Sequence, residues 1–550
     1  WVAAIPKIST SIAPNLGPPL TTEQAHAVVE ITNDDGHFKT WLLHGITGSG
    51  KTEVYLRIIA SVLAKNKQSL VLIPEINLTP QLEAVFRERF SAIPLVSLHS
   101  GLNDTERLMN WLQAQSGEAK IILGTRLAVF TPLPNLGLII VDEEHDTSFK
   151  QHEGLRYSAR DLAIFRAKQI NIPIILGSAT PSLESYHNAL THRYHSIRLT
   201  SRAIENARLP TIEYIDTRTD KRREGLSSAL IDAISQCLAE KHQSLIFINR
   251  RGYAPVLLCR SCGWSAACHR CSSRLVVHLR DKKLCCHHCG HDEHFPRACP
   301  DCGNQDLAPF GLGTQRVEET LAAHFPSARI ARIDRDSTRR KHAWKDILQA
   351  IHTHQVDILV GTQILSKGHD FTNLSLVGIL NADTSLFSTD YRASERLFAQ
   401  LMQVAGRAGR AEIPGHVMIQ TEFPEHQLYR ALQRQDYDSL AHALLAERKA
   451  ARFPPFVHQA LLRAESHAMH DVMDFLQQAS RLVAHTNTIE MFDPVPAQIA
   501  RLKGMERAQV LVQSNSRNQL QKFLARWYTE INRLSVHKIR WTLDVDPVEF

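Results

Sequence analysis

The sequence predicts an α/β protein with two blocks of parallel sheet, a cysteine-rich insertion in the second block and a small α+β domain at the C-terminal end. Three observations support this fold class. Short apolar runs alternate twice with amphipathic stretches, the pattern of buried strands between covering helices. Nine of the ten cysteines fall between Cys259 and Cys302. The alternating rhythm changes after residue 456.

The composition is that of an ordinary globular protein, with 43% hydrophobic and 22% charged residues among 550. No apolar run approaches the ~20 residues of a membrane helix, and the chain begins at Trp1 without a secretory pattern. We therefore expect a soluble protein that is a fragment of a longer chain. The formal net charge of +7 is compatible with a polyanionic partner. The paired cysteines are typical of metal binding in a reducing compartment, which favours the cytoplasm.

Five segments follow one another along the chain. Residues 1–19, rich in Pro and Ser, are predicted to be a linker or arm. The first lobe is expected over 20–205, with strands at 41–45, 69–74, 119–125, 136–144 and 172–180. The second lobe is expected over 206–254 and 309–452, with strands at 244–249, 328–334, 356–362, 376–383 and 415–421. The insertion covers 255–308, and 453–550 forms the C-terminal domain.

The stretch GITGSGKT (45–52) lies between an apolar run and an amphipathic one, which is the context of a phosphate-binding loop. Its glycines allow backbone N–H groups to close around phosphates at a helix N-terminus. Lys51 is expected to contact the β- and γ-phosphates of ATP, and the Thr52 hydroxyl to ligate Mg²⁺. The other residues expected to line the nucleotide are Gly45, Ile46, Thr47, Gly48, Ser49 and Gly50.

An apolar run that ends in acids, LGLIIVDEEHD (136–146), supports the same site. Asp142 is expected to hold Mg²⁺ through its water shell. Glu143 is then placed to orient and deprotonate the attacking water. Standing alone, the run also fits a strand that ends in a solvated acidic turn.

The DEEH sequence after a phosphate-binding loop resembles the DExH signature of superfamily-two helicases, which implies two RecA-like lobes. The resemblance implies that Gln24, in LTTEQ (20–24), reads adenine. It also implies that the loops GTR, with Thr125 and Arg126, and GSAT (177–180) touch the nucleic-acid backbone or couple it to ATP.

The second block carries QVAGRAGR (403–410), which resembles the helicase motif that places arginines against the γ-phosphate. Guanidinium groups remain ionised and stabilise the charge of the transition state. Arg407 and Arg410 are the predicted arginines, with Gln403 sensing nucleotide or water. The octamer alone also fits a basic helix terminus on the surface.

A further match in the second block is LVGTQILSKGHDF (359–371), which resembles the fifth helicase motif. The resemblance implies DNA-backbone contacts by Thr362 and Gln363, and places Gly368 and Asp370 near the ATP cleft.

Aromatic and basic residues follow the acidic motif in DEEHDTSFKQHEGLRYSARDLA (142–163). Such interleaving suits stacking on unpaired bases and neutralisation of phosphates. The predicted DNA contacts are Phe149, Lys150, Arg156 and Tyr157. Without the neighbouring helicase motifs, Phe149 and Tyr157 would be interpreted as core residues. The segment resembles the aromatic-rich loop of the PriA family of bacterial replication-restart helicases, as do 74–81, 381–410 and 447–456.

This resemblance implies an ATP-dependent 3′→5′ DNA helicase that acts at stalled or collapsed forks and nucleates primosome assembly. The implied partners are forked and single-stranded DNA, single-strand-binding protein, other primosome proteins and the replicative helicase, all at the bacterial nucleoid. Family members begin with a 3′-end-binding domain and a winged-helix domain, and neither precedes Trp1. An alternative is a zinc-ribbon platform that binds forks and uses ATP hydrolysis as a switch without processive unwinding.

The insertion contains four Cys-x-x-Cys pairs, and two thiolates at this spacing can hold one ion from a tight turn. The pairs are Cys259/Cys262, Cys268/Cys271, Cys286/Cys289 and Cys299/Cys302. Eight thiolates predict two structural Zn²⁺ sites, because four sulfur ligands leave no open position. The spacing does not fix which pairs combine. Nesting of the outer pairs and of the inner pairs is favoured, since it brings the two ends of the insertion together, and the family shares it.

Overall fold

The computed structural model describes residues 17–549 except 34–35, 75–78, 204–209, 221, 224, 250–255, 260, 263, 265, 270–274, 279–282, 286–290, 306, 311–313, 335–342, 363–370, 372, 387–389, 410–413, 484–487 and 535–537. The chain divides into two compact units, Trp1–Asn206 and Ala207–Phe550. Among the described helices, none combines the length and apolar character needed to cross a lipid bilayer.

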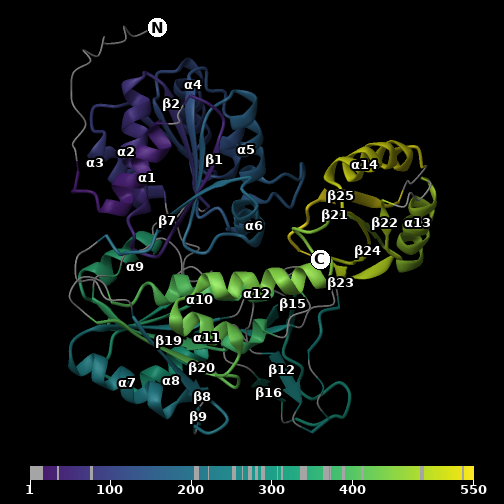
Figure 1. Cartoon of the computed structure of the whole chain (residues 1–550). Helices are drawn as coiled ribbons and strands as arrows, with labels where there is room; N and C mark the ends of the chain where they lie inside the picture. The colour runs from purple at the N-terminus through teal and green to yellow at the C-terminus, as the bar shows by residue number, and fades with distance from the viewer. Residues whose placement is uncertain are drawn as a thin grey trace. The chain divides into compact units, whose positions relative to one another are not determined.

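The first unit is built on a seven-stranded parallel sheet with the order β3-β4-β2-β5-β6-β1-β7 (Figure 1). Its strands are β1 (Thr40–Gly45), β2 (Gln68–Leu72), β3 (Leu95–Leu98), β4 (Ile121–Gly124), β5 (Leu136–Asp142), β6 (Ile174–Ser178) and β7 (His195–Leu199). Its helices are α1 (Thr22–Asn33), α2 (Lys51–Ala64), α3 (Thr79–Arg89), α4 (Asp104–Ser116), α5 (Ala159–Gln169) and α6 (Leu183–Leu190).

Both faces of this sheet are covered, which explains why its strands are apolar almost throughout. One core contains Trp41 and Tyr55, and the other contains Leu42 and Phe149. Trp41 and Leu42 are consecutive in β1, so their side chains point to opposite faces of the sheet. Because all the strands are parallel, their C-terminal ends meet at one edge of the sheet, where the loop after β1 and Asp142 of β5 lie.

The second unit contains a six-stranded parallel sheet with the order β17-β18-β11-β19-β20-β8. Its strands are β8 (Thr211–Asp216), β11 (Gln243–Ile248), β17 (Ile330–Ile333), β18 (Ile358–Gly361), β19 (Leu374–Leu380) and β20 (His416–Thr421). Its helices are α7 (Ser228–Ala239), α8 (Thr314–His324), α9 (Ala343–His352), α10 (Ala393–Ala405), α11 (Gln427–Arg434) and α12 (Tyr437–Ala450). The predicted α/β class with parallel sheets is confirmed.

The cysteine-rich insertion forms an antiparallel sheet of its own, with the order β15-β14-β13-β12-β16. The strands are β12 (Val256–Cys259), β13 (Val276–His278), β14 (Lys283–Cys285), β15 (Asp292–His294) and β16 (Leu307–Phe310). The first strand, β12, pairs with the last, β16, so the insertion begins and ends side by side. Its small core includes Leu257, Leu275 and Leu284.

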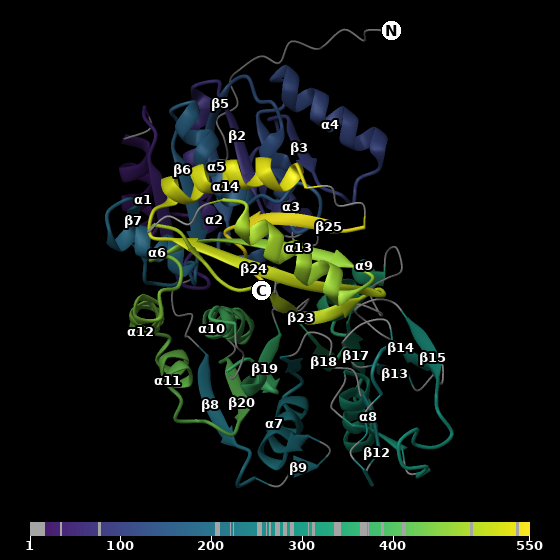
Figure 2. The same cartoon turned by 90° about the vertical axis from the view of Figure 1, so that its right-hand side faces the viewer.

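The C-terminal domain is an antiparallel sheet with two helices on one face, as Figure 2 shows. The sheet contains β21 (His458–Ser466), β22 (Glu490–Met491), β23 (Val495–Leu502), β24 (Met505–Ser514) and β25 (Arg540–Val545). The helices α13 (Met469–Arg481) and α14 (Arg517–Asn532) bury Phe475 and Trp527 against it. This arrangement confirms the α+β expectation for the segment.

Candidate functional site

The loop 45–50 connects β1 to α2, which begins at Lys51. Gly48 and Gly50 have φ angles of +83° and +74°, a conformation that side-chain-bearing residues rarely adopt. The loop is therefore shaped by these glycines, as a phosphate-binding loop requires. Lys51 Nζ donates a hydrogen bond to the carbonyl oxygen of Gly45 at 2.8 Å, so the ammonium group lies across the loop.

The buried side chain of Gln24 fixes the same loop from α1. Its Nε2 donates to the carbonyl oxygen of Ser49 at 2.8 Å, and its Oε1 accepts from the backbone N–H of Thr21 at 2.9 Å. A pocket of about 520 Å³ borders the first turn of α2 at Thr52. Its lining consists of Gly17, Pro18, Thr52, Glu53, Leu56, Val85, Glu88 and Arg89.

The predicted acids lie at the C-terminal end of β5. Asp142 accepts a hydrogen bond from the Tyr55 hydroxyl at 3.0 Å. Burial of its carboxyl group and repulsion by Glu143 raise the pKa of Asp142 to about 6, although Lys51 and Tyr55 oppose the shift. Glu143 has a φ of +48°, a strained conformation of the kind that functional sites often hold.

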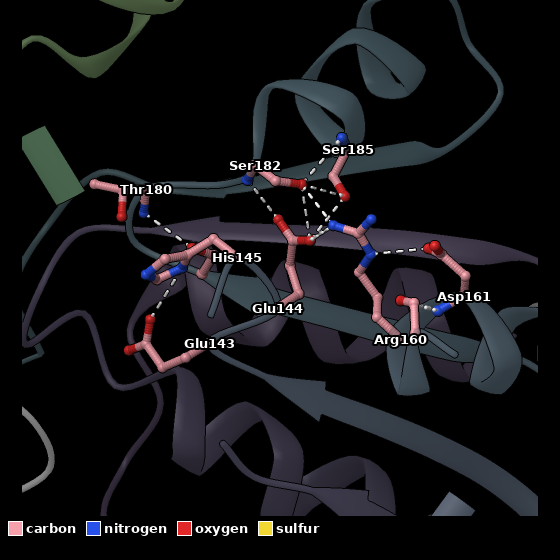
Figure 3. A network of polar contacts seen from close by, with 10 residues as sticks. Glu143, Glu144, His145, Arg160, Asp161, Thr180, Ser182 and Ser185 are labelled. Carbon is pink, nitrogen blue, oxygen red and sulfur yellow. Dashed lines mark hydrogen bonds and ion pairs between the residues drawn. The ribbon is translucent and has the colours of Figure 1, made fainter. Parts of the chain in front are cut away.

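His145 connects the acidic motif to the GSAT loop (Figure 3). His145 Nδ1 lies 3.5 Å from Glu143 Oε2 and 2.7 Å from the Ser178 hydroxyl. The Ser178 hydroxyl accepts a hydrogen bond from the Thr180 backbone N–H at 3.0 Å. The catalytic candidate Glu143 is thus held next to the loop that was expected to couple ATP to nucleic acid.

Glu144 is fully buried and forms a polar network of its own (Figure 3). Its Oε1 accepts from the backbone N–H of Ser182 at 2.6 Å, at the start of α6. Its Oε2 accepts from Ser185 at 2.8 Å and from Arg160 at 3.0 Å. Arg160, near the start of α5, also pairs with Asp161. Sequence reasoning assigned no role to Glu144, because its buried partners are distant in the sequence.

The segment after the acidic motif is attached to the GTR loop. The guanidinium of Arg126 donates to the carbonyl oxygens of Ser148 and Lys150, both at 2.9 Å. Phe149 is 2% exposed and belongs to the core, and Lys150 is 5% exposed. In this conformation neither side chain is presented for DNA contact as the sequence predicted, because alternation alone does not reveal which residues of a loop turn inward.

Phe130 is an exposed aromatic residue close to this segment. The ring of Phe130, which is 48% exposed, meets the ring of Tyr157 edge-on at 4.8 Å. Tyr157 and Arg156 are partly exposed, as DNA-contact residues need to be. Phe130 was missed by sequence reasoning, since it precedes the acidic motif and stands alone among apolar neighbours.

In the second unit, Gln403 and Arg407 lie at the C-terminal end of α10, and both are partly exposed. Thr362 directly follows β18. Arg410, Gln363, Gly368 and Asp370 lie outside the described residues. The structure therefore places Gln403 and Arg407 together at one helix end.

The structure brings together the outer two cysteine pairs of the insertion. The sulfur atoms of Cys259, Cys262, Cys299 and Cys302 all lie within 4.8 Å of one another. The Cys259–Cys302 and Cys262–Cys299 sulfur distances are both 3.6 Å. A tetrahedral zinc site with bonds of ~2.3 Å has edges of roughly 3.8 Å, so these four residues fit Zn²⁺. Of the inner pairs, Cys268 is described, whereas Cys271, Cys286 and Cys289 lie outside the described residues.

Three protein families match separate parts of the chain. Residues 21–189 match the DEAD/DEAH box helicase family, and 310–412 match the helicase conserved C-terminal domain. Residues 449–548 match the primosomal protein N C-terminal domain. A solved structure of RecG bound to a three-way DNA junction is 17% identical, with a TM-score of 0.48 over 78% of this chain and 47% of that chain, a likeness too distant to define function.

Relatives that match 96–97% of the chain are replication restart proteins PriA. The chain is 44% identical to the Haemophilus influenzae protein, with 96% of this chain and 72% of that protein covered. It is 39% identical to the Rickettsia conorii protein over 97% of this chain and 82% of that one. Identity to the Bacillus subtilis protein is 39%, over 96% and 66%. The extent and identity of these matches show that the chain belongs to the PriA family of replication restart proteins.

Proposed function

We propose that the chain is an ATP-dependent DNA helicase that unwinds 3′→5′ at stalled or collapsed replication forks and nucleates primosome assembly. The observation that carries this proposal is the meeting of Lys51 with Asp142 and Glu143 at one edge of a parallel sheet. The helicase families matched in both units support the same activity. They do not favour a platform that hydrolyses ATP without unwinding.

The donor groups of the first unit fit Mg²⁺–ATP. The Thr52 hydroxyl and the Asp142 carboxylate would hold the cation, which neutralises charge on the phosphates when bound. Lys51 would exchange its hydrogen bond with Gly45 for the phosphates. Glu143 would take the proton of the attacking water, with His145 at 3.5 Å limiting its movement. Gln24, which fixes the loop through Ser49, would read the adenine base.

Charge on the transferred phosphate needs stabilisation in addition to that from Lys51. We assign this role to Arg407 and Arg410, with Gln403 sensing the nucleotide or the attacking water. Guanidinium groups suit the role because they remain ionised at any working pH. Gly368 and Asp370 belong to the same proposal. Closure around ATP and reopening after hydrolysis would turn chemistry into movement along DNA.

DNA contact is assigned to the exposed edge of the first unit, where Arg156, Tyr157 and Phe130 lie. Thr125, with Thr362 and Gln363 of the second unit, would contact the backbone. The partners proposed are forked and single-stranded DNA, single-strand-binding protein, other primosome proteins and the replicative helicase, in the bacterial cytoplasm at the nucleoid.

The insertion is proposed to hold two structural Zn²⁺ ions. The first site consists of the four clustered sulfurs. The second would combine Cys268 and Cys271 with Cys286 and Cys289. Metal would make this small segment rigid, because about fifty residues form little core of their own. We propose that it separates strands or docks primosome proteins.

ATP hydrolysis measured with and without forked DNA, together with strand displacement, tests the function. We expect DNA to stimulate hydrolysis, and we expect displacement from substrates with a 3′ single-stranded tail but not from matched 5′-tailed substrates. The Lys51→Ala variant is the negative control. Stimulated hydrolysis without displacement from either substrate would contradict the helicase and favour the platform.

A further inference from the structure

The buried hydroxyl of Tyr55 requires an explanation that core packing does not supply. Tyr55 lies one turn after Lys51 on α2 and is 2% exposed, with its ring in the hydrophobic core. Phenylalanine would fill that core equally well. The tyrosine instead carries its hydroxyl to 3.0 Å from Asp142 Oδ1, at the end of β5.

A glycine in strand β6 leaves space for the contact between Tyr55 and Asp142. Gly177 of β6 is the register partner of Asp142. A Cβ atom at position 177 would lie 1.6 Å from the Tyr55 hydroxyl oxygen and 2.8 Å from the adjoining ring carbon. Any side chain there would therefore displace the phenol. Glycine weakens the interior of a strand. Its presence in β6 is therefore consistent with close approach by another group.

The hydroxyl acts directly on the Asp142 carboxylate. Its O–H group donates a hydrogen bond to Oδ1 at 3.0 Å. Donation to Oδ1 restricts rotation of the carboxyl group and occupies one of its two oxygen atoms. A carboxylate held in this way loses less freedom when it binds a cation.

We infer that Tyr55 is a positioning residue that orients Asp142 toward the cation of a bound Mg²⁺–nucleotide, in a space that Gly177 keeps open. The inference rests on the proposed function, because it assumes that Asp142 holds the cation. Two residues one turn apart on α2 would then have different roles. Lys51 would bind the phosphates, and Tyr55 would orient Asp142.

The test is binding of a fluorescent ADP analogue to the Tyr55→Phe variant, first in EDTA and then across a Mg²⁺ titration. Affinity in EDTA should stay within about twofold of the parent, because the ring is retained. The Mg²⁺ concentration that gives half of the gain in affinity should rise roughly five- to tenfold, as expected when a hydrogen bond to a charged group is lost. Tyr214→Phe is the matched control, since its hydroxyl bonds the Tyr429 carbonyl in the other unit.

An unchanged Mg²⁺ midpoint in Tyr55→Phe would overturn the inference while leaving the proposed function intact. A parent protein whose affinity does not respond to Mg²⁺ would overturn both. Gly177→Ala gives a second test. This variant should lower the melting temperature, and adding Tyr55→Phe should recover part of the loss, because the atom at 1.6 Å is removed. No recovery would show that Gly177 does not accommodate the hydroxyl.

Discussion

Glu144 accepts a hydrogen bond from the backbone N–H of Ser182 at 2.6 Å, although the two residues follow different strands of the first sheet. The contact satisfies an N–H group at the start of α6, where helices have no internal acceptors. The second glutamate of the DEEH sequence is therefore a structural anchor. It holds the GSAT segment and Arg160 against the strand that carries the catalytic candidates.

The first prediction concerns this anchor. Glu144→Gln should lower the free energy of unfolding by about 2–4 kcal/mol, because it removes a fully buried carboxylate that pairs with Arg160 alongside Asp161. Chemical denaturation measures the change. Asp104→Asn is the control, because its ion pair with Arg107 is exposed and should contribute little. Equal small effects in both variants would argue against the anchor.

The second prediction separates nucleotide binding from turnover. Lys51→Ala should abolish ATP hydrolysis and leave DNA affinity largely intact, because Lys51 lies on the phosphate-binding loop. Glu143→Gln should retain ATP binding and lose at least ~100-fold in turnover, since a general base typically contributes that much. Equilibrium binding of a nucleotide and steady-state hydrolysis provide the measurements. Retained turnover in Lys51→Ala would contradict the phosphate-site assignment.

The third prediction concerns pH. The folded-state pKa of Asp142, about 6, lies above its ordinary value of 3.8, so the nucleotide-free protein loses stability as pH rises from about 4 to about 6. Asp142→Asn should therefore stabilise the nucleotide-free protein at pH 7, by on the order of 2 kcal/mol. The gain should shrink toward zero near pH 4, while ATP hydrolysis is lost. Denaturation curves at both pH values would show the difference.

The fourth prediction distinguishes two phenylalanines. Phe149→Ala should cost about 3–5 kcal/mol of stability, because it removes a core ring. Phe130→Ala should leave the melting temperature nearly unchanged, because the ring is 48% exposed, and should weaken binding of single-stranded DNA several-fold. Fluorescence anisotropy with labelled oligonucleotide measures the affinity. Full DNA affinity in Phe130→Ala would remove it from the DNA-binding surface.

The fifth prediction concerns metal content. Cys302→Ser should lose one zinc ion per chain by elemental analysis, because Cys302 belongs to the four-sulfur cluster. Cys237→Ala should keep the full zinc content, since Cys237 is buried in the core of the second lobe and lies in α7. Zinc retained in Cys302→Ser at the level of the parent would contradict the site.

Much of the site could be predicted from the sequence, because its chemistry is encoded in short contiguous motifs. The loop around Lys51 and the strand end at Asp142 fall where the alternation of apolar and amphipathic segments places them. The cysteine spacing predicted metal ligands and favoured nesting of the outer pairs, and the four outer cysteines lie together in the structure.

Contacts between distant residues could not be predicted in this way. Tyr55 was an ordinary apolar-face residue of an amphipathic helix until Gly177 and Asp142 were placed beside it. Phe149, a predicted DNA contact, is 2% exposed, and Arg126 donates hydrogen bonds to the carbonyl oxygens of the residues on either side of it. Such three-dimensional arrangements leave no periodic signal in the sequence.

The antiparallel pairing of β12 with β16 has an implication for how this protein can be altered. Leu257 is paired with Pro309, so the first and last strands of the insertion are adjacent. A short Gly-Ser linker could replace the chain between β12 and β16 without separating the two parts of the second lobe that the insertion interrupts. Such a deletion would test the role of the insertion, and it would also uncover Leu502 of β23, which packs against the core of the insertion.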